Sequence, residues 1–129
     1  MMSQFAPARG AARAYEPTVG PWLAFDLGAQ IEQLRQEPYW QSGRNSKTIV
    51  HYPDFRVVVT AIQANTTIHE HRTAGRVAVQ TLHGHLRMHA AGKEFDLPAG
   101  RILVVDHAVP YDLHAVEDSA LLLIVAWPD

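Results

Sequence analysis

From residue 47 onward the sequence falls into short runs of β-prone residues separated by turn residues, and this pattern restricts the possible folds most. The runs cover 48–50, 55–62, 66–71, 76–83, 85–89, 94–97, 102–105 and 121–127. Turn formers such as Pro53-Asp54, Ala91-Gly92 and Pro98-Ala99-Gly100 stand between them. Many short strands at a spacing of roughly 8–12 residues predict an all-β sandwich or barrel.

The composition is that of an ordinary globular protein. The chain has 129 residues, which suits one domain. Hydrophobic residues make up 47% and charged residues 19%, with a formal net charge of -2, which argues against disorder and against a basic nucleic-acid binder. Because there is no cysteine, disulfides, thiolate metal sites and cysteine nucleophiles are excluded. Any metal must therefore be held by nitrogen and oxygen.

Targeting signals are not visible in the chain. The first twenty residues lack the apolar stretch of a signal peptide, and the longest apolar run, 120–127, is far shorter than the roughly 20 residues that cross a bilayer as a helix. We therefore expect a cytoplasmic protein that contacts neither a membrane nor a nucleic acid.

We expect two parts along the chain: a flexible segment over 1–20 and a single domain over 21–129. Trp22, Ala24 and Leu27 suggest a short strand at the start of that domain. Asp26 can cap a helix that carries Ile31 and Leu34 on one face, and Pro38 ends it. This helix is expected to be the only one, within an N-terminal strand and helix at about 21–40. The barrel itself is expected over about 47–127.

His69-Glu70-His71 is the sequence feature that most favours a functional site. Side chains two residues apart on a strand share one face, so both imidazoles can point at a single metal ion. The same alternation turns Glu70 away from them. Two imidazoles alone bind a divalent ion weakly, and catalytic sites in proteins use three ligands with open positions for the substrate.

These residues resemble the cupins, a family of small double-sheeted barrels with a His-x-His motif and a glycine-rich second motif. The resemblance spans about 65–127. His69 and His71 match the paired histidines, Gly84 the glycine that closes the first motif, and Gly100 the glycine that opens the second. It implies a cupin double-stranded β-helix, or jelly-roll barrel, and a divalent metal such as Zn, Fe, Ni or Mn.

The second motif and the acidic position depart from the cupin pattern. Counting from Gly100 puts Asp106 at the usual proline, Ala108 at the usual glycine and Tyr111 at the usual histidine. Counting back from Gly84 puts Val77, with Arg76 beside it, where the acidic ligand is expected. Two of the four ligands that the resemblance implies are therefore replaced.

We consider two residues as the source of the missing third ligand, His107 and His114. His107 lies in the loop before Tyr111, while alternation puts His114 on the opposite face from Tyr111 unless a bulge resets the strand. Among the other histidines, alternation of His85, Arg87 and His89 with Leu86 and Met88 predicts a polar strand face. His83 is grouped with these surface histidines.

Two functional classes remain open. In the first, a metalloenzyme such as an oxygenase or isomerase uses a metal held by His69, His71 and a third ligand, with Tyr111 as proton donor and Arg76 as anion anchor. In the second, a non-catalytic module binds or senses a small molecule in the same barrel without metal. Neither class specifies the substrate.

The sequence also predicts the core and the oligomeric state. Ten apolar strand positions are expected to be largely buried: Val57, Val59, Val77, Val79, Leu86, Met88, Leu103, Val105, Leu121 and Leu123. The resemblance to small cupins, together with edge strands that need covering, predicts a homodimer. The segment 22–40 is expected to help cover the sheet.

Overall fold

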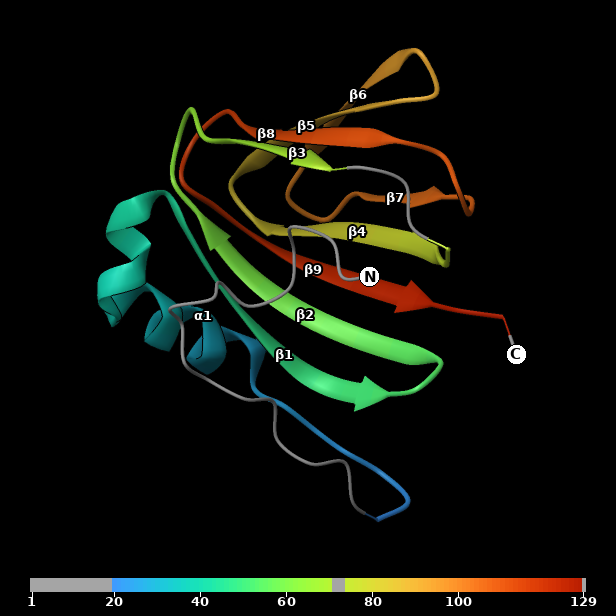
Figure 1. The fold of residues 1–129 in the computed structure, drawn as a ribbon. Helices are drawn as coiled ribbons and strands as arrows, with labels where there is room; N and C mark the ends of the chain where they lie inside the picture. Colours follow the sequence, from blue (N-terminus) through green and yellow to red (C-terminus); the bar gives the residue numbers. More distant parts are fainter. Residues whose placement is uncertain (1–19, 71–73, 129) are drawn as a thin grey trace.

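The computed structural model describes residues 20–70 and 74–128, and it shows two antiparallel sheets that face each other (Figure 1). The larger sheet contains, in spatial order, β1 (Arg44–Tyr52), β2 (Phe55–Ile62), β9 (Ser119–Ala126), β4 (Arg76–His83) and β7 (Ile102–Val105). The smaller sheet contains β3 (Thr67–Glu70), β8 (Tyr111–Ala115), β5 (His85–Ala90) and β6 (Lys93–Pro98). The predicted all-β class is confirmed.

The main core fills the space between the two sheets. Alternating residues of each strand point inward, and the core-facing side chains of both sheets are apolar almost throughout. Eight of the ten predicted core residues are buried: Val59, Val77, Val79, Leu86, Met88, Val105, Leu121 and Leu123. Val57 and Leu103 are only partly buried. Val57 packs on the outer face of the larger sheet, and Leu103 lies on its short edge strand.

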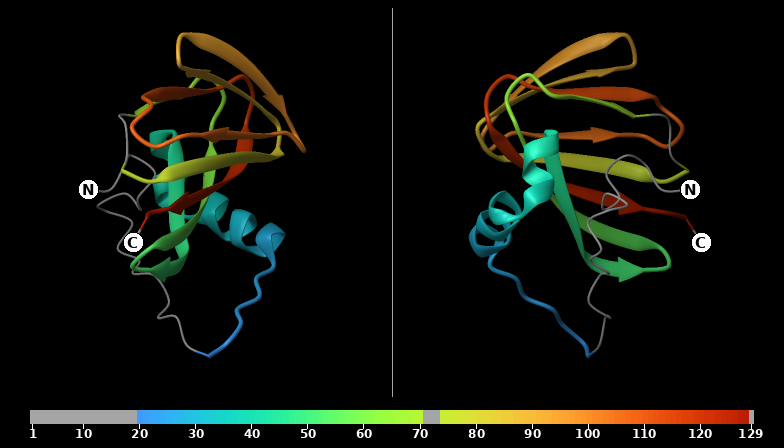
Figure 2. Two further views of the ribbon diagram at one scale, coloured as in Figure 1. Left: turned by 90° about the vertical axis from the view of Figure 1, so that its right-hand side faces the viewer. Right: turned by 60° about the vertical axis from the view of Figure 1, so that its left-hand side comes forward.

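A second, smaller core lies between the helix and the outer face of the larger sheet. The helix α1 (Leu27–Gln36) begins where predicted, since the Asp26 carboxylate accepts a hydrogen bond from the Ala29 backbone N–H at 3.1 Å. Ile31 and Leu34 are buried against residues of β1, β2 and β9. Figure 2 shows the helix beside the larger sheet. No helix in the described part of the chain is long and apolar enough to cross a membrane.

The connection from α1 to β1 differs from the prediction. No strand forms over 21–26, and a 3-10 helix, η2 (Pro38–Ser42), follows α1. The fully buried Asn45 joins these pieces, because its Nδ2 donates to the Leu34 carbonyl at 2.9 Å and to Glu37 Oε1 at 2.8 Å. In place of the predicted strand, Leu23 packs against the helix-side core and Leu27 begins α1.

One end of the barrel gathers most of the candidate site, and we call it the mouth. The pairings of Glu70 with Tyr111, Val77 with Val105 and Arg76 with Ala126 bring the ends of β3, β7 and β9 together with the starts of β4 and β8. These termini lie on the right in Figure 1. The β7–β8 loop, the end of β3 and the start of β4 therefore lie at this end.

Candidate functional site

The His-x-His motif lies at the end of β3, where alternation decides which side chains reach the space between the sheets. Ile68 is 1% exposed and belongs to the core, whereas the side chain of His69 is 73% exposed. His69 therefore stands on the outer face of the smaller sheet. His71 lies outside the described residues, as do 1–19, for which a flexible segment was predicted. The shared metal role of the two histidines stays a prediction.

Tyr111 faces inward at the mouth. It is 3% exposed, belongs to the main core, and its phenol oxygen is buried. The β-ladders pair it with Ala90 on one side and with Glu70 on the other. The predicted proton donor is thus an inward-facing side chain at the end of the barrel, and His114 stands on the opposite face of β8, as alternation predicted.

The described residues do not fit a metal ion inside the barrel. No three of their histidine, aspartate or glutamate side chains form a group able to hold a metal ion. The structure also separates the two proposed third ligands. His107 lies in the loop after β7 at the mouth, and His114 lies on the outer face of β8 with His69. The buried polar residues on the inward face of the larger sheet are serines and threonines, such as Thr60, Thr81 and Ser119, and none of these is an ordinary ligand of a divalent transition metal.

Arg76, Asp106 and His107 form a compact polar cluster at the mouth. Asp106 Oδ1 accepts three hydrogen bonds: from Arg76 Nε at 2.9 Å, from the His107 backbone N–H at 2.8 Å, and from His107 Nδ1 at 3.0 Å. The bonds from His107, first the backbone and then the ring, hold the pKa of the Asp106 carboxyl below its usual value, and the Arg76 charge adds to this effect. Asp106 thereby fixes the guanidinium and the imidazole next to each other.

A cavity of about 140 Å³ opens beside this cluster, lined by Ala74, Arg76, His107 and Pro128. Asp106 is not part of the lining, so the polar groups that face the cavity are the two donors. Asp106 does line a larger and mainly apolar cavity of about 240 Å³, whose lining also includes Phe95, Leu103 and Val109. The mouth therefore combines a cavity lined by two donors with a mainly apolar one that the Asp106 carboxylate also lines.

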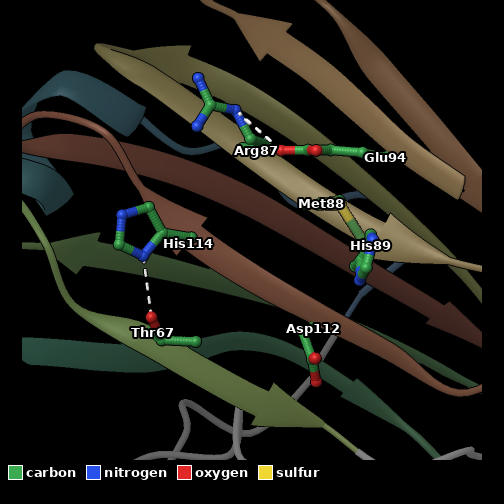
Figure 3. A pocket seen from close by; sticks show the side chains of 7 residues that line it. All are labelled: Thr67, Arg87, Met88, His89, Glu94, Asp112 and His114. Atoms are coloured by element: carbon green, nitrogen blue, oxygen red, sulfur yellow. Dashed lines mark hydrogen bonds and ion pairs between the residues drawn. The ribbon is translucent and has the colours of Figure 1, made fainter.

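A second polar site covers the outer face of the smaller sheet. Two neighbouring cross-strand rows run over β3, β8, β5 and β6. The first row consists of His69, Asp112, His89 and Glu94. The second row consists of Thr67, His114, Arg87 and Asp96. We call these eight residues the outer polar grid. It surrounds a cavity of about 270 Å³, and Figure 3 shows the side chains that line it.

The interactions within the outer polar grid run between neighbouring strands. His114 Nδ1 and Thr67 Oγ1 are 2.8 Å apart, and His69 Nδ1 is 3.6 Å from Asp112 Oδ1. Arg87 Nε is 3.1 Å from Glu94 Oε2 (Figure 3). Next to the grid, the hydrogen bond from His85 holds the pKa of the Asp96 carboxyl below its usual value.

Two site residues were not identified from the sequence. The cupin resemblance places Asp106 only at the position of a proline, and the sequence analysis assigns no role to Asp112. The signal for Asp112 was present, since Asp112 and His114 are two apart and flank the buried Leu113. The signal for Asp106 was weaker, because its link to Arg76 joins residues thirty positions apart in the chain.

No protein-family model and no curated protein matches the chain. Solved structures do match it. A conserved protein of unknown function from Streptococcus pyogenes has a TM-score of 0.70 at 24% identity, over 92% of this chain and 98% of that one. A cupin superfamily protein from Desulfitobacterium hafniense has a TM-score of 0.64 at 13% identity, over 66% of this chain and 78% of that one.

Salicylate 1,2-dioxygenase from Pseudoaminobacter salicylatoxidans has a TM-score of 0.71 at 17% identity. The match covers 79% of this chain but 34% of the dioxygenase, so the chain spans about a third of that enzyme. One structure of the enzyme contains gentisate. At these identities structural likeness establishes the fold and no more. The chain has the cupin fold, as the His-x-His and glycine motifs predicted.

Proposed function

We propose that this protein binds a small organic anion, such as an aromatic or aliphatic carboxylate, at the mouth of its barrel. One observation carries the proposal: Arg76 and His107 line the same cavity, and both donate to Asp106, which is not part of that lining. A guanidinium held in one orientation is suited to a carboxylate or phosphate, because its donors form a planar fork.

The size and polarity of the mouth favour an organic acid over an inorganic anion. The donor-lined cavity of about 140 Å³ accommodates one anionic group. The adjoining apolar cavity of about 240 Å³ offers Phe95, Leu103 and Val109 to a hydrocarbon or ring. Small-molecule sites in proteins typically combine an apolar lining with a few polar groups that fix the orientation.

Arg76 has the largest role in this proposal. A hydrogen bond to a charged group contributes roughly 1.5–3 kcal/mol, so its loss weakens binding by about 10- to 100-fold. His107 supplies a second donor. Tyr111 lies at the same end of the barrel with a buried phenol oxygen, and its role as a proton donor remains a proposal that requires a bound substrate. No metal-dependent step is included, because the described residues provide no ligand set in the barrel.

Isothermal titration calorimetry with benzoate, salicylate and gentisate tests this proposal. The last two are named for a protein of similar fold, and the series varies the ring substituents around one carboxylate. We expect the wild type to bind at least one of these carboxylates. We expect the affinity of Arg76→Gln for it to be at least about 10-fold lower. Arg87→Gln is the matched control, since Arg87 lies on the outer face of the smaller sheet. Equal affinity of wild type and Arg76→Gln for every carboxylate that binds would reject the proposal.

We also propose that the protein is a homodimer. The supporting observation is the edge strand β7, where Ile102 and Val104 are 52% and 63% exposed on the outer face of the larger sheet. Among the described residues, the helix-side core extends over β1, β2, β9 and Leu82 of β4, and includes no residue of β7. Exposed apolar groups at such a position favour a protein contact.

The cytoplasmic location expected from the sequence likewise stays a prediction.

A further inference from the structure

The two carboxylate oxygens of Asp106 have different surroundings. Oδ1 accepts the hydrogen bonds from Arg76 Nε and from the backbone and ring of His107, at 2.8 to 3.0 Å. Within the described residues, Oδ2 accepts no hydrogen bond. The side chain of Asp106 is 63% exposed, so a ligand at the mouth can reach this second oxygen.

Asp106 also brings a carboxylate to a cavity that is otherwise apolar. It lines the cavity of about 240 Å³, whose seven other lining residues, among them Phe95, Leu103 and Val109, all have apolar side chains. A ligand that fills this cavity therefore needs a hydrocarbon body. It also needs one polar group that suits a carboxylate.

The charge of Asp106 determines which polar group fits. The hydrogen bonds from His107, together with the Arg76 charge, hold the pKa of the Asp106 carboxyl below its usual value, so this group is ionised at neutral pH. An ionised carboxylate only accepts hydrogen bonds, and it repels a second carboxylate. The complementary group of a ligand is therefore a donor, such as a hydroxyl or an amino group.

The same residues connect this acceptor to the anion site at the mouth. Arg76 and His107 line the cavity of about 140 Å³, and both donate to Asp106. The groups that suit a carboxylate and the oxygen that suits a donor thus lie on directly bonded neighbours. In a 2-hydroxy or 2-amino acid the donor group stands on the carbon next to the carboxylate, so one small molecule can contact both.

We propose that the mouth binds an acid that carries a hydroxyl or amino group beside its carboxylate, and that Asp106 Oδ2 selects this class of ligand. The inference rests on the proposed function, because it requires the carboxylate to lie at Arg76 and His107. The neighbouring hydroxyl or amino group donates to Asp106, and the hydrocarbon part enters the apolar cavity. Asp106 thereby distinguishes such acids from plain carboxylates of the same shape.

Calorimetry of the full-length wild type with three acids of one carbon skeleton tests this selection. Phenylpropionate, phenyllactate and phenylalanine carry a hydrogen, a hydroxyl and an ammonium group, respectively, on the carbon next to the carboxylate. We expect phenyllactate, phenylalanine or both to bind at least about 10-fold more tightly than phenylpropionate, because each adds a hydrogen bond to a charged group. A preference for one of the two identifies the donor as a hydroxyl or as an ammonium group.

Asp106→Asn separates ligand selection from the positioning of Arg76 and His107. Its amide oxygen can still accept their hydrogen bonds, while its amide nitrogen puts a donor where Oδ2 was. We expect the preference for phenyllactate or phenylalanine over phenylpropionate to disappear in this variant. Circular dichroism at the titration temperature verifies that it is folded.

Asp96→Asn is the matched control. Asp96 likewise lies beside a histidine and an arginine, His85 and Arg87, but it belongs to the outer polar grid. We expect this variant to keep the wild-type preference among the three acids.

Equal affinity of the wild type for the three acids would overturn the inference, and so would a preference that persists in Asp106→Asn. Failure of phenyllactate and phenylalanine to bind, where phenylpropionate or benzoate binds, would also overturn it. In each of these cases the Arg76→Gln titrations decide separately whether the anion site at the mouth stands. If no carboxylate binds to the wild type, both proposals are rejected.

Discussion

Ala108, in the loop before β8, shows how the backbone accommodates a residue that differs from the cupin pattern. Ala108 stands where the cupin resemblance places a glycine, and its φ is +65°, in the left-handed region that glycine favours. An alanine there is strained by roughly 1 kcal/mol. The sequence therefore departs from the cupin pattern at residue 108, but the backbone there has the left-handed conformation that glycine favours.

We predict that Ala108→Gly is neutral or stabilising, by up to about 1 kcal/mol, because release of strain outweighs the entropy that glycine adds to the unfolded chain. Urea unfolding of both proteins measures the difference. Ala29→Gly provides the comparison, since Ala29 is exposed in the helix α1 and the same substitution there should cost about 1 kcal/mol. Equal destabilisation by both substitutions would contradict the role of backbone strain at Ala108.

Asp106 predicts a pH dependence of stability. Its pKa is lowered in the folded protein by His107 and Arg76, so the charged carboxylate stabilises the fold above the ordinary aspartate value, 3.8. This contribution disappears as the pH falls through the lowered folded-state pKa. We expect wild type to exceed Asp106→Asn in unfolding free energy at pH 7, and the gap to narrow at pH 3. A gap that is the same at both pH values would contradict this assignment.

His69 shows why sequence alone could not locate the site. Alternation correctly indicates that residues two apart share a face, but it does not say which face is buried. That choice is made by Ile68, which fills the core together with Leu113 of the paired strand. The pairing of Arg76 with Asp106 was equally hidden, because it depends on the register between β4 and β7.

At the scale of elements, periodicity predicted the long apolar strands well. The bounds of β2, β4 and β7 are those expected from the sequence, and the Asp26-capped helix is confirmed. The strand β8 was missed although Tyr111, Leu113 and Ala115 alternate with Asp112 and His114, because it is only five residues long and Pro110 precedes it. Its identity depends on pairing with β3 and β5, which is a long-range property.

The turn between β4 and β5 supports a prediction at this scale. Gly84 has φ +82°, and a side chain there would press against the Asp118 carbonyl and Ser119. We expect Gly84→Ala to lose about 3 kcal/mol or more, from backbone strain and overpacking together. Gly100→Ala separates the two effects, since Gly100 has φ +95° but open space around it. Its expected loss is about 1–2 kcal/mol, and equal losses in thermal unfolding would exclude a packing role for Gly84.

At the scale of the whole molecule, the larger sheet is covered unevenly. One face packs against the smaller sheet, and on the other the helix-side core extends over β1, β2, β9 and Leu82 of β4 in the described residues. The cross-strand row Val57, Ile124, Ala78 and Val104 carries no polar side chain. The segment 22–40 thus covers its own sheet, in part as predicted, and leaves the β7 side exposed.

The exposed end of this row, at Val104 on β7, predicts where the homodimer forms. We expect light scattering at micromolar concentration to show a dimer for the wild type and a monomer for Val104→Glu, because a charge buried without a partner costs several kcal/mol and weakens association more than about 100-fold. Val116→Glu is the control, since Val116 is also exposed but lies after β8, on the other sheet. A monomeric wild type would refute the dimer. A dimer that persists in Val104→Glu but not in Val116→Glu would move the interface to the smaller sheet, next to the outer polar grid.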